Sequence, residues 1–262
     1  MPGRPARSLA LRASAVYALG ADIGHQHVRV ALCELSGTPV WNDGVATDVD
    51  HAPGETLDLA AELIRRALDE KGIDRSRVLG LGIDIAAPVR EPGGVLEAHG
   101  IMPGWIGVQP GAELERRTGL TTWLANDADA GALAERNYGA GRNVDDMIYV
   151  RLSGGIGAGI IANGRHLHGS GGLAGEIGHI RSQADGRVCR CGNRGCLETV
   201  AGPDAITRLL TDSWGYPVTV SDLVALVQAG DRGAIRALED AAEEIGRVLA
   251  DAPRLLATTL VR

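Results

Sequence analysis

The pattern of apolar and polar residues early in the chain predicts strands. Two runs rich in apolar residues, 15–22 (AVYALGAD) and 28–35 (VRVALCEL), are followed by a Ser36–Gly37 turn and the segment TPVWN. Residues 54–70 instead place Leu, Ile and Ala at helical spacing on one face, and a further strand is predicted at 78–86. The first part of the chain is therefore expected to form a strand meander, a helix and another strand.

The second half of the chain mixes helical and strand patterns. The predicted elements are a helix at 110–118, a strand at 121–125, a helix from Asn126–Asp127 to about residue 141, a strand at 147–152 and, after Cys196, helices that include one at 231–250. Asn163–Gly164, within GIIANG, is typical of a tight hairpin turn. Strands joined sometimes by hairpins and sometimes by helices predict mixed α/β layers.

Composition favours a folded protein and excludes several functional classes. The 262 residues are 45% hydrophobic and 23% charged, with a formal net charge of -7, so neither disorder nor a basic nucleic-acid surface is indicated. No apolar run reaches about 18 residues and no signal-peptide core is present. We therefore expect a cytoplasmic protein without membrane contact. Residues 1–14, rich in Pro, Arg and Ser, are expected to be a linker or tail.

The strongest candidate site is a cluster of metal-ligand residue types within GHIRSQADGRVCRCGNRGC. Its members are His179, Cys189, Cys191 and Cys196. Three thiolates and an imidazole satisfy tetrahedral Zn²⁺, and four protein ligands predict a structural rather than a catalytic ion. The alternative is a surface loop of reduced, free thiols. Three cysteines and a histidine within 18 residues of a Cys-poor chain favour zinc.

Asn126 and Asp127 are a second candidate, because they follow a short predicted strand. An aspartate there can accept a proton from a sugar hydroxyl while the asparagine holds a neighbouring hydroxyl, as phosphoryl transfer to a sugar requires. Asn and Asp are also ordinary helix N-caps. From these two residues alone, the capping role is the stronger interpretation.

Glycine-rich turns offer candidate phosphate sites. The run SGGIGAG contains Gly155, Gly157 and Gly159, but a strand follows it, whereas a dinucleotide fingerprint must open a helix. A phosphate-facing hairpin and a purely structural turn remain equally open. Asp22 and Gly24, in GADIGHQH, either hold a metal–phosphate group at a hairpin or simply end a strand.

Two carboxylates flank the cysteine cluster, Glu176 and Glu198. A closed zinc loop could aim both inward, and carboxylates accept hydrogen bonds from several sugar hydroxyls at once. Each would be called a surface charge in isolation. The remaining histidines, among them His166 and His168, show no recognisable ligand spacing.

Four segments together resemble the ROK family, a group of repressors, open reading frames and sugar kinases. They are GADIG, NDADAGALAE, LSGGIGAGIIANGRHLHGSGGLAGEIGH and CRCGNRGCLE, in the family's order and within about residues 18–249. The resemblance implies an actin-like, ribonuclease-H-like ATPase and sugar-kinase fold with two lobes, 15–125 and 126–262, the second holding the zinc loop 179–196. It also implies a homo-oligomer. The residues it implies as sugar contacts are Asn126, Asp127, Glu176, His179 and Glu198.

Departures from the family pattern separate two functions. The hairpin reads DIGHQH where kinases carry DxGGTK, no glycine follows Gly246, and DAPRLLATTLVR replaces the strand and helices that would close the second lobe. The start, GRPARSLALRAS, resembles the linker after the winged helix of the family's repressors. We expect the sugar-binding effector part of a transcriptional regulator, without a winged helix in this chain and with no DNA contact of its own.

The alternative is an ATP-dependent hexose kinase that uses Mg²⁺. Asp127 would then be the general base, Asp22 would orient metal and phosphate, and the glycines at 155, 157 and 159 would line the phosphate. A non-functional remnant is the third possibility. The kinase requires ATP and Mg²⁺ as cofactors, whereas zinc is expected in either functional case.

Overall fold

The computed structural model describes residues 12–90, 94–96, 100–256 and 259–260; most of the predicted 1–14 tail lies outside them. The chain divides into two compact units, one formed by residues up to 84 with 109–124 and the other by 85–108 with 125 onward. Residues 85–108, which we expected in the first lobe, thus cluster with the second unit.

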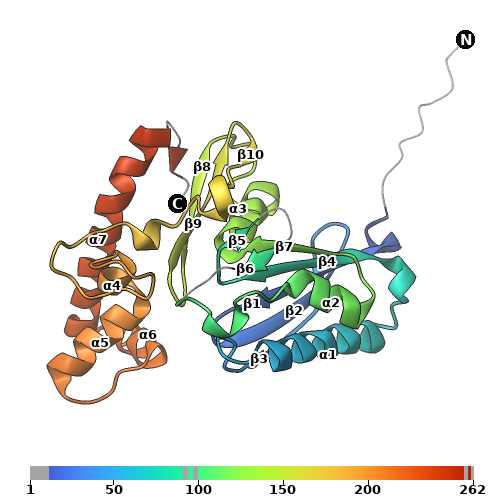
Figure 1. Cartoon of the computed structure of the whole chain (residues 1–262), viewed down its shortest axis with the longest axis horizontal. Helices are drawn as coiled ribbons and strands as arrows, with labels where there is room; N and C mark the ends of the chain where they lie inside the picture. The colour runs from blue at the N-terminus through green and yellow to red at the C-terminus, as the bar shows by residue number, and fades with distance from the viewer. Residues whose placement is uncertain (1–11, 91–93, 97–99, 257–258, 261–262) are drawn as a thin grey trace, which may run out of the picture. The chain divides into compact units, whose positions relative to one another are not determined.

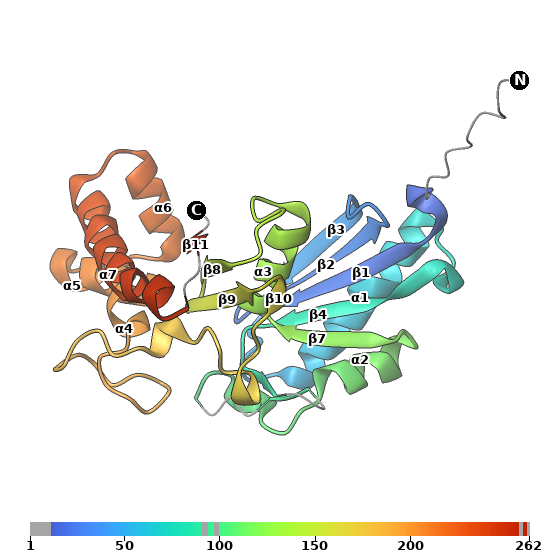
Figure 2. The same ribbon diagram turned by 90° about the horizontal axis from the view of Figure 1, so that it is seen from above.

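The first unit is built on a five-stranded sheet of order β3-β2-β1-β4-β7 (Figure 2). Its strands are β1 (Tyr17–Ile23), β2 (His27–Glu34), β3 (Pro39–Ala46), β4 (Val78–Ile85) and β7 (Thr122–Asn126). β1 pairs with β2, and β2 with β3, in antiparallel register. The predicted meander is confirmed, and β3 continues beyond TPVWN to Ala46.

Two helices accompany this sheet. α1 (Pro53–Lys71) packs against β2 and β3, and α2 (Pro110–Thr118) packs against α1. α1 buries the predicted stripe, including Leu57, Ile64 and Leu68, and ends at Gly72, whose φ of 61° is the left-handed conformation typical of a helix C-cap. Both helices are confirmed to within one residue of their predicted ends.

The second unit contains a four-stranded sheet of order β10-β9-β8-β11. The strands are β8 (Met147–Leu152), β9 (Ile156–Ala162), β10 (Arg165–His166) and β11 (Thr259–Leu260), and a separate hairpin pairs β5 (Val89–Arg90) with β6 (Val95–Leu96). Asn163 and Gly164 both have positive φ, 51° and 70°, as a two-residue hairpin turn requires. The predicted hairpin is confirmed.

Helices cover both faces of this second sheet (Figure 1). α3 (Asp127–Tyr138) packs on one face of β8 and β9, where Ala132, Met147 and Ile161 are buried. The opposite face, with Ile148 and Ile156, shares a larger core with the C-terminal helices. These helices are α4 (Glu198–Ala201), α5 (Pro203–Trp214), α6 (Val220–Gln228) and α7 (Arg232–Leu256).

The C-terminal segment differs from its predicted form. α7 continues to Leu256 instead of ending near residue 250, and Thr259–Leu260 form β11, which pairs in parallel with β8. Part of DAPRLLATTLVR therefore supplies a strand, which we had expected to be missing. That pairing joins residues more than 100 positions apart, so local periodicity could not predict it. Among the described residues, no helix combines the length and apolar character needed to cross a membrane.

Candidate functional site

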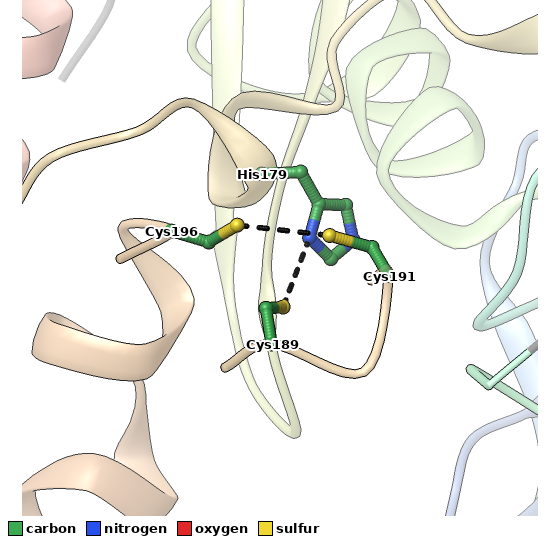
Figure 3. Close-up of side chains that lie close together, drawn as sticks. All are labelled: His179, Cys189, Cys191 and Cys196. Atoms are coloured by element: carbon green, nitrogen blue, oxygen red, sulfur yellow. Dashed lines mark hydrogen bonds between the residues drawn. The ribbon is translucent and has the colours of Figure 1, made fainter. Parts of the chain in front are cut away.

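His179, Cys189, Cys191 and Cys196 come together in the second unit (Figure 3). One ligand atom from each lies within 4.8 Å of the other three. Sγ of Cys189 is 3.6 Å from Nδ1 of His179, and the Sγ atoms of Cys191 and Cys196 are also 3.6 Å apart. These separations are close to the edge of a tetrahedron with bonds of about 2.0–2.3 Å, so the donor set and its geometry both fit Zn²⁺.

The loop that carries the cysteines is folded by backbone hydrogen bonds at two glycines. The N–H of Ser182 donates to the carbonyl of Gly195 at 2.8 Å, and the N–H of Gly192 donates to the carbonyl of Cys189 at 3.0 Å. Gly195 has φ 69°, and a Cβ there would overlap the carbonyl oxygen of Gln183. Glycine is therefore required at 195 for the two limbs to approach.

Burial sets the protonation of the cluster. Desolvation lowers the pKa of His179, so its imidazole is neutral at neutral pH, the form that ligates metals. Burial, with hydrogen bonds from the neighbouring thiols, raises the pKa of Cys196 to about 12. A cation bound among these sulfurs would favour the thiolate and offset that penalty.

His179 links the cluster to a carboxylate. Its Nδ1 faces Cys189, whereas its Nε2 is 3.7 Å from Oε2 of Glu176. Burial raises the pKa of Glu176 to about 7, and the charges of Asp127, Asp129 and Glu198 add to the rise. The carboxylates predicted around the cysteine loop thus share one acidic region with Asp127.

Glu198 begins α4 directly after Cys196–Leu197 and is paired with an arginine. Oε1 of Glu198 accepts a hydrogen bond from Nε of Arg190 at 2.9 Å and forms an ion pair with Nη2 at 2.8 Å. Its other oxygen faces Gly155, where a Cβ would lie 2.5 Å away. Gly154, Arg190 and Glu198 line an open pocket of about 280 Å³.

Asn126 caps α3, as the stronger interpretation of the sequence held. Its Oδ1 accepts hydrogen bonds from the N–H groups of Ala128 and Asp129, at 2.8 and 3.4 Å, and its Nδ2 donates to the carbonyl of Ala87 at 3.2 Å. Oδ2 of Asp127 is 3.0 Å from Nε of Arg151, and both side chains are about four-fifths buried. The side chain of Asp127 is thus held by an ion pair.

Two of the glycines after Ser153, Gly157 and Gly159, allow close packing against α3. The space that a Cβ of Gly159 would occupy is filled by Ala128 and Ala132 of α3, and a Cβ at Gly157 would touch Ala128. Gly155 lies in the turn between β8 and β9, where the N–H of Ser153 donates to its carbonyl. A strand follows this turn, as predicted, so the run is not a dinucleotide fingerprint.

Asp22 and Gly24 lie at the β1–β2 hairpin of the first unit. Nε2 of His27 is 3.0 Å from Oδ2 of Asp22, and a Cβ at Gly24 would overlap the His27 imidazole. The N–H of Gly24 donates to the carbonyl of His27 at 3.0 Å. The imidazole therefore fills the concave side of this turn.

The sequence analysis missed three features of the site: the Arg190–Glu198 pair, the Arg151–Asp127 pair, and a contact of Asp129 with His166 and His168. An arginine-rich chain gives no local sign of which arginine meets which acid. The one partial sign of the third is the His-x-His spacing of His166 and His168, which brings two imidazoles close together in the chain.

Comparison with known proteins identifies relatives of two kinds. The model of the ROK family matches residues 18–261. The xylose repressor of Bacillus subtilis is 27% identical over 238 residues, which are 91% of this chain and 61% of the repressor. The glucokinase of Thermotoga maritima is 32% identical over 233 residues, 86% of this chain and 69% of that enzyme. This chain thus spans about three fifths of the repressor's length.

A solved structure supports the same grouping. The ROK family glucokinase from Streptomyces griseus, in complex with glucose and AMPPNP, superposes with a TM-score of 0.82 at 27% identity. The match covers 92% of this chain and 80% of that one. The predicted fold class is confirmed by this likeness.

Proposed function

This chain belongs to the ROK family, and we propose that it is the sugar-binding effector part of a transcriptional regulator. The ligand is a small sugar whose hydroxyls are held by polar side chains of the second unit. The contacts proposed are Asn126, Asp127, Glu176, His179 and Glu198. The acidic region formed by these carboxylates supports the proposal, because carboxylates accept hydrogen bonds from sugar hydroxyls.

Zinc has a structural role in this proposal. His179, Cys189, Cys191 and Cys196 would hold one ion, which would fix the loop preceding Glu198 and the imidazole that faces Glu176. Because all four positions are taken by protein atoms, the ion supplies rigidity and leaves no open position for chemistry. The sugar site would then depend on the metal without touching it.

The observation that favours a regulator over a kinase is the position of the His27 side chain in the β1–β2 hairpin. His27 lies against Gly24 and contacts Asp22. A phosphate approaching this turn would therefore meet an imidazole instead of the backbone N–H groups that bind phosphate in such turns. The contacts of Asp127 act in the same direction, because its Oδ2 pairs with Arg151 and its Oδ1 accepts a hydrogen bond from the N–H of Ala128, so both oxygens that could accept a proton from a sugar hydroxyl already have partners.

A hexose kinase is the second candidate, favoured by the place of Asp127 at the start of α3 and by the likeness to glucokinases. Asp127 would act as general base, and Asp22, Gly24, Gly155, Gly157 and Gly159 would serve ATP and Mg²⁺. Such an enzyme would release ADP when its sugar is present. Asp127→Asn would then stop turnover.

Sugar binding is tested by thermal melting of the purified, zinc-loaded chain with a panel of aldohexoses, pentoses and N-acetylhexosamines. A sugar present at about 100 times its dissociation constant stabilises by about 2.7 kcal/mol, which corresponds to a rise of about 5–10 °C for a protein of this size. Glu176→Gln should reduce the rise, whereas Glu62→Gln, on the exposed face of α1, should not. A flat response to every sugar contradicts the proposal.

A further inference from the structure

A second group of metal-ligand side chains lies outside the cysteine cluster. Asp129, in the first turn of α3, meets His166 at the end of β10 and His168 two residues later. One ligand atom from each of the three lies within 4.8 Å of the others. All belong to the second unit, and α3 and β10 both pack on β9.

The distances suit a divalent transition metal. Oδ1 of Asp129 is 2.8 Å from Nε2 of His166, and Oδ2 is 3.8 Å from Nδ1 of His168. Metal–nitrogen and metal–oxygen bonds of about 2.0–2.2 Å place ligand atoms about 3.4 Å apart in a tetrahedron. The two measured separations lie on either side of that value, so small side-chain movements would bring all three ligand atoms to bonding distance from one ion.

Burial and packing hold the three side chains in place. Asp129 is 7% exposed at its side chain, and the two histidines are 20% and 25% exposed. The imidazole rings meet edge to face with centroids 5.6 Å apart. Within the described part of the chain, Nε2 of His168 is buried and has no hydrogen-bond partner; Gly172 packs beside it.

That orphaned nitrogen argues for a ligand. A buried polar atom without a partner costs free energy, and a bound ligand would remove that cost. With the ring proton on Nδ1, which faces Asp129, the lone pair of Nε2 is left without a partner, and a cation bound by that lone pair would supply one.

We propose that Asp129, His166 and His168 form a second metal site, which binds a divalent transition ion of the Zn²⁺, Co²⁺ or Ni²⁺ type. Two imidazoles and one carboxylate are a donor set that these ions accept. Three protein ligands leave at least one position for water or another small ligand, in contrast to the closed cysteine cluster. The ion would join α3 to the loop after β10.

The site is tested by titrating Co²⁺ into the full chain after one equivalent of Zn²⁺ has filled the cysteine cluster, followed by calorimetry and visible absorption. We expect one further equivalent of Co²⁺, bound without the intense sulfur-to-cobalt charge-transfer bands that thiolate ligands give. His168→Gln and Asp129→Asn should each weaken this binding by about tenfold or more. His51→Gln, an exposed histidine beside Asp48, is the matched control and should leave it unchanged.

Each outcome decides the question. No further equivalent in the wild type, thiolate bands on the added cobalt, or unchanged affinity in a folded His168→Gln chain would overturn the proposal. Circular dichroism shows whether each variant folds, and His166→Asn replaces any that does not. Because the titration contains no sugar and no ATP, its result is independent of the proposed effector function.

Discussion

Arg190 binds a single oxygen of Glu198, through Nε at 2.9 Å and Nη2 at 2.8 Å. The second oxygen, Oε2, therefore points toward Gly155. This arrangement pairs one oxygen of Glu198 with a guanidinium and leaves the other outside that ion pair, and both Arg190 and Glu198 line the pocket that Gly154 also lines. The side chain is thus fixed in orientation before any ligand arrives, which lowers the entropy cost of binding.

Gly155→Ala tests that arrangement. The added Cβ would lie 2.5 Å from Oε2 of Glu198, so the carboxylate must move or the turn must shift. We expect sugar affinity to fall about tenfold, equivalent to about 1.4 kcal/mol. The measurement is calorimetric titration with the sugar that gives the largest melting rise. Gly54→Ala, where a Cβ meets nothing within 4 Å, is the control; equal affinities in both variants would contradict the assigned role of Glu198.

Removal of zinc should loosen the second unit. Dialysis against a chelator would leave three sulfurs and an imidazole without the ion that joins them, and we expect the melting temperature to fall by about 5 °C or more. Readdition of one equivalent of Zn²⁺ should restore it. A purified chain that holds no stoichiometric zinc, or that melts identically without it, would show that the cluster is a set of free thiols.

Cysteine variants separate metal loss from the general effect of removing a thiol. Cys196→Ser should abolish stoichiometric zinc, because it removes one of four ligands. Cys33→Ser, in β2 of the first unit, should keep one zinc per chain. Elemental analysis of both purified variants makes the comparison, and zinc retained by the Cys196 variant would count against the ligand set.

Asn126→Ala should destabilise the chain by about 1 kcal/mol through loss of the N-cap of α3. The hydrogen bond to the carbonyl of Ala87 is lost as well. Asn137→Ala is the control, because Asn137 lies in the same helix but is exposed, and its Nδ2 donates to the carbonyl of Leu133. Urea unfolding compares the two, and a larger loss for Asn137 would contradict the capping role.

Two glycines of the cysteine loop make a matched pair. Both have positive φ, 69° at Gly195 and 90° at Gly192, so alanine at either costs roughly 1–2 kcal/mol of backbone strain. Only at Gly195 would the Cβ also overlap the carbonyl of Gln183. Gly195→Ala should therefore lower zinc affinity more than Gly192→Ala, as measured by competition with a chromophoric chelator. The reverse order would show that the loop is held in another way.

Local signals in the sequence predicted most elements of the fold. The apolar stripe of α1, the Asn163–Gly164 turn and the cap at Asn126 each depend on residues close in sequence, so their physics is visible in a short window. The cysteine cluster could be predicted for the same reason, because its four residues are near neighbours in the chain. β11 was not predicted because its partner strand, β8, is distant in sequence.

Side-chain partners explain what the sequence left undecided at the site. His27 enters the turn at Gly24 because the antiparallel register of β1 and β2 brings it beside Asp22. Arg151 meets Asp127 because β8 lies under α3. Each contact occupies a carboxylate oxygen of the aspartate, yet neither contact follows from the motif that contains that aspartate.

The most direct test of the account follows ADP release by the zinc-loaded chain with ATP, Mg²⁺ and a sugar that the melting experiment has shown to bind. The account predicts sugar binding with ADP release no faster than in sugar-free controls, and no change on Asp127→Asn. Sustained, sugar-dependent ADP release that Asp127→Asn abolishes would contradict it and establish the kinase instead.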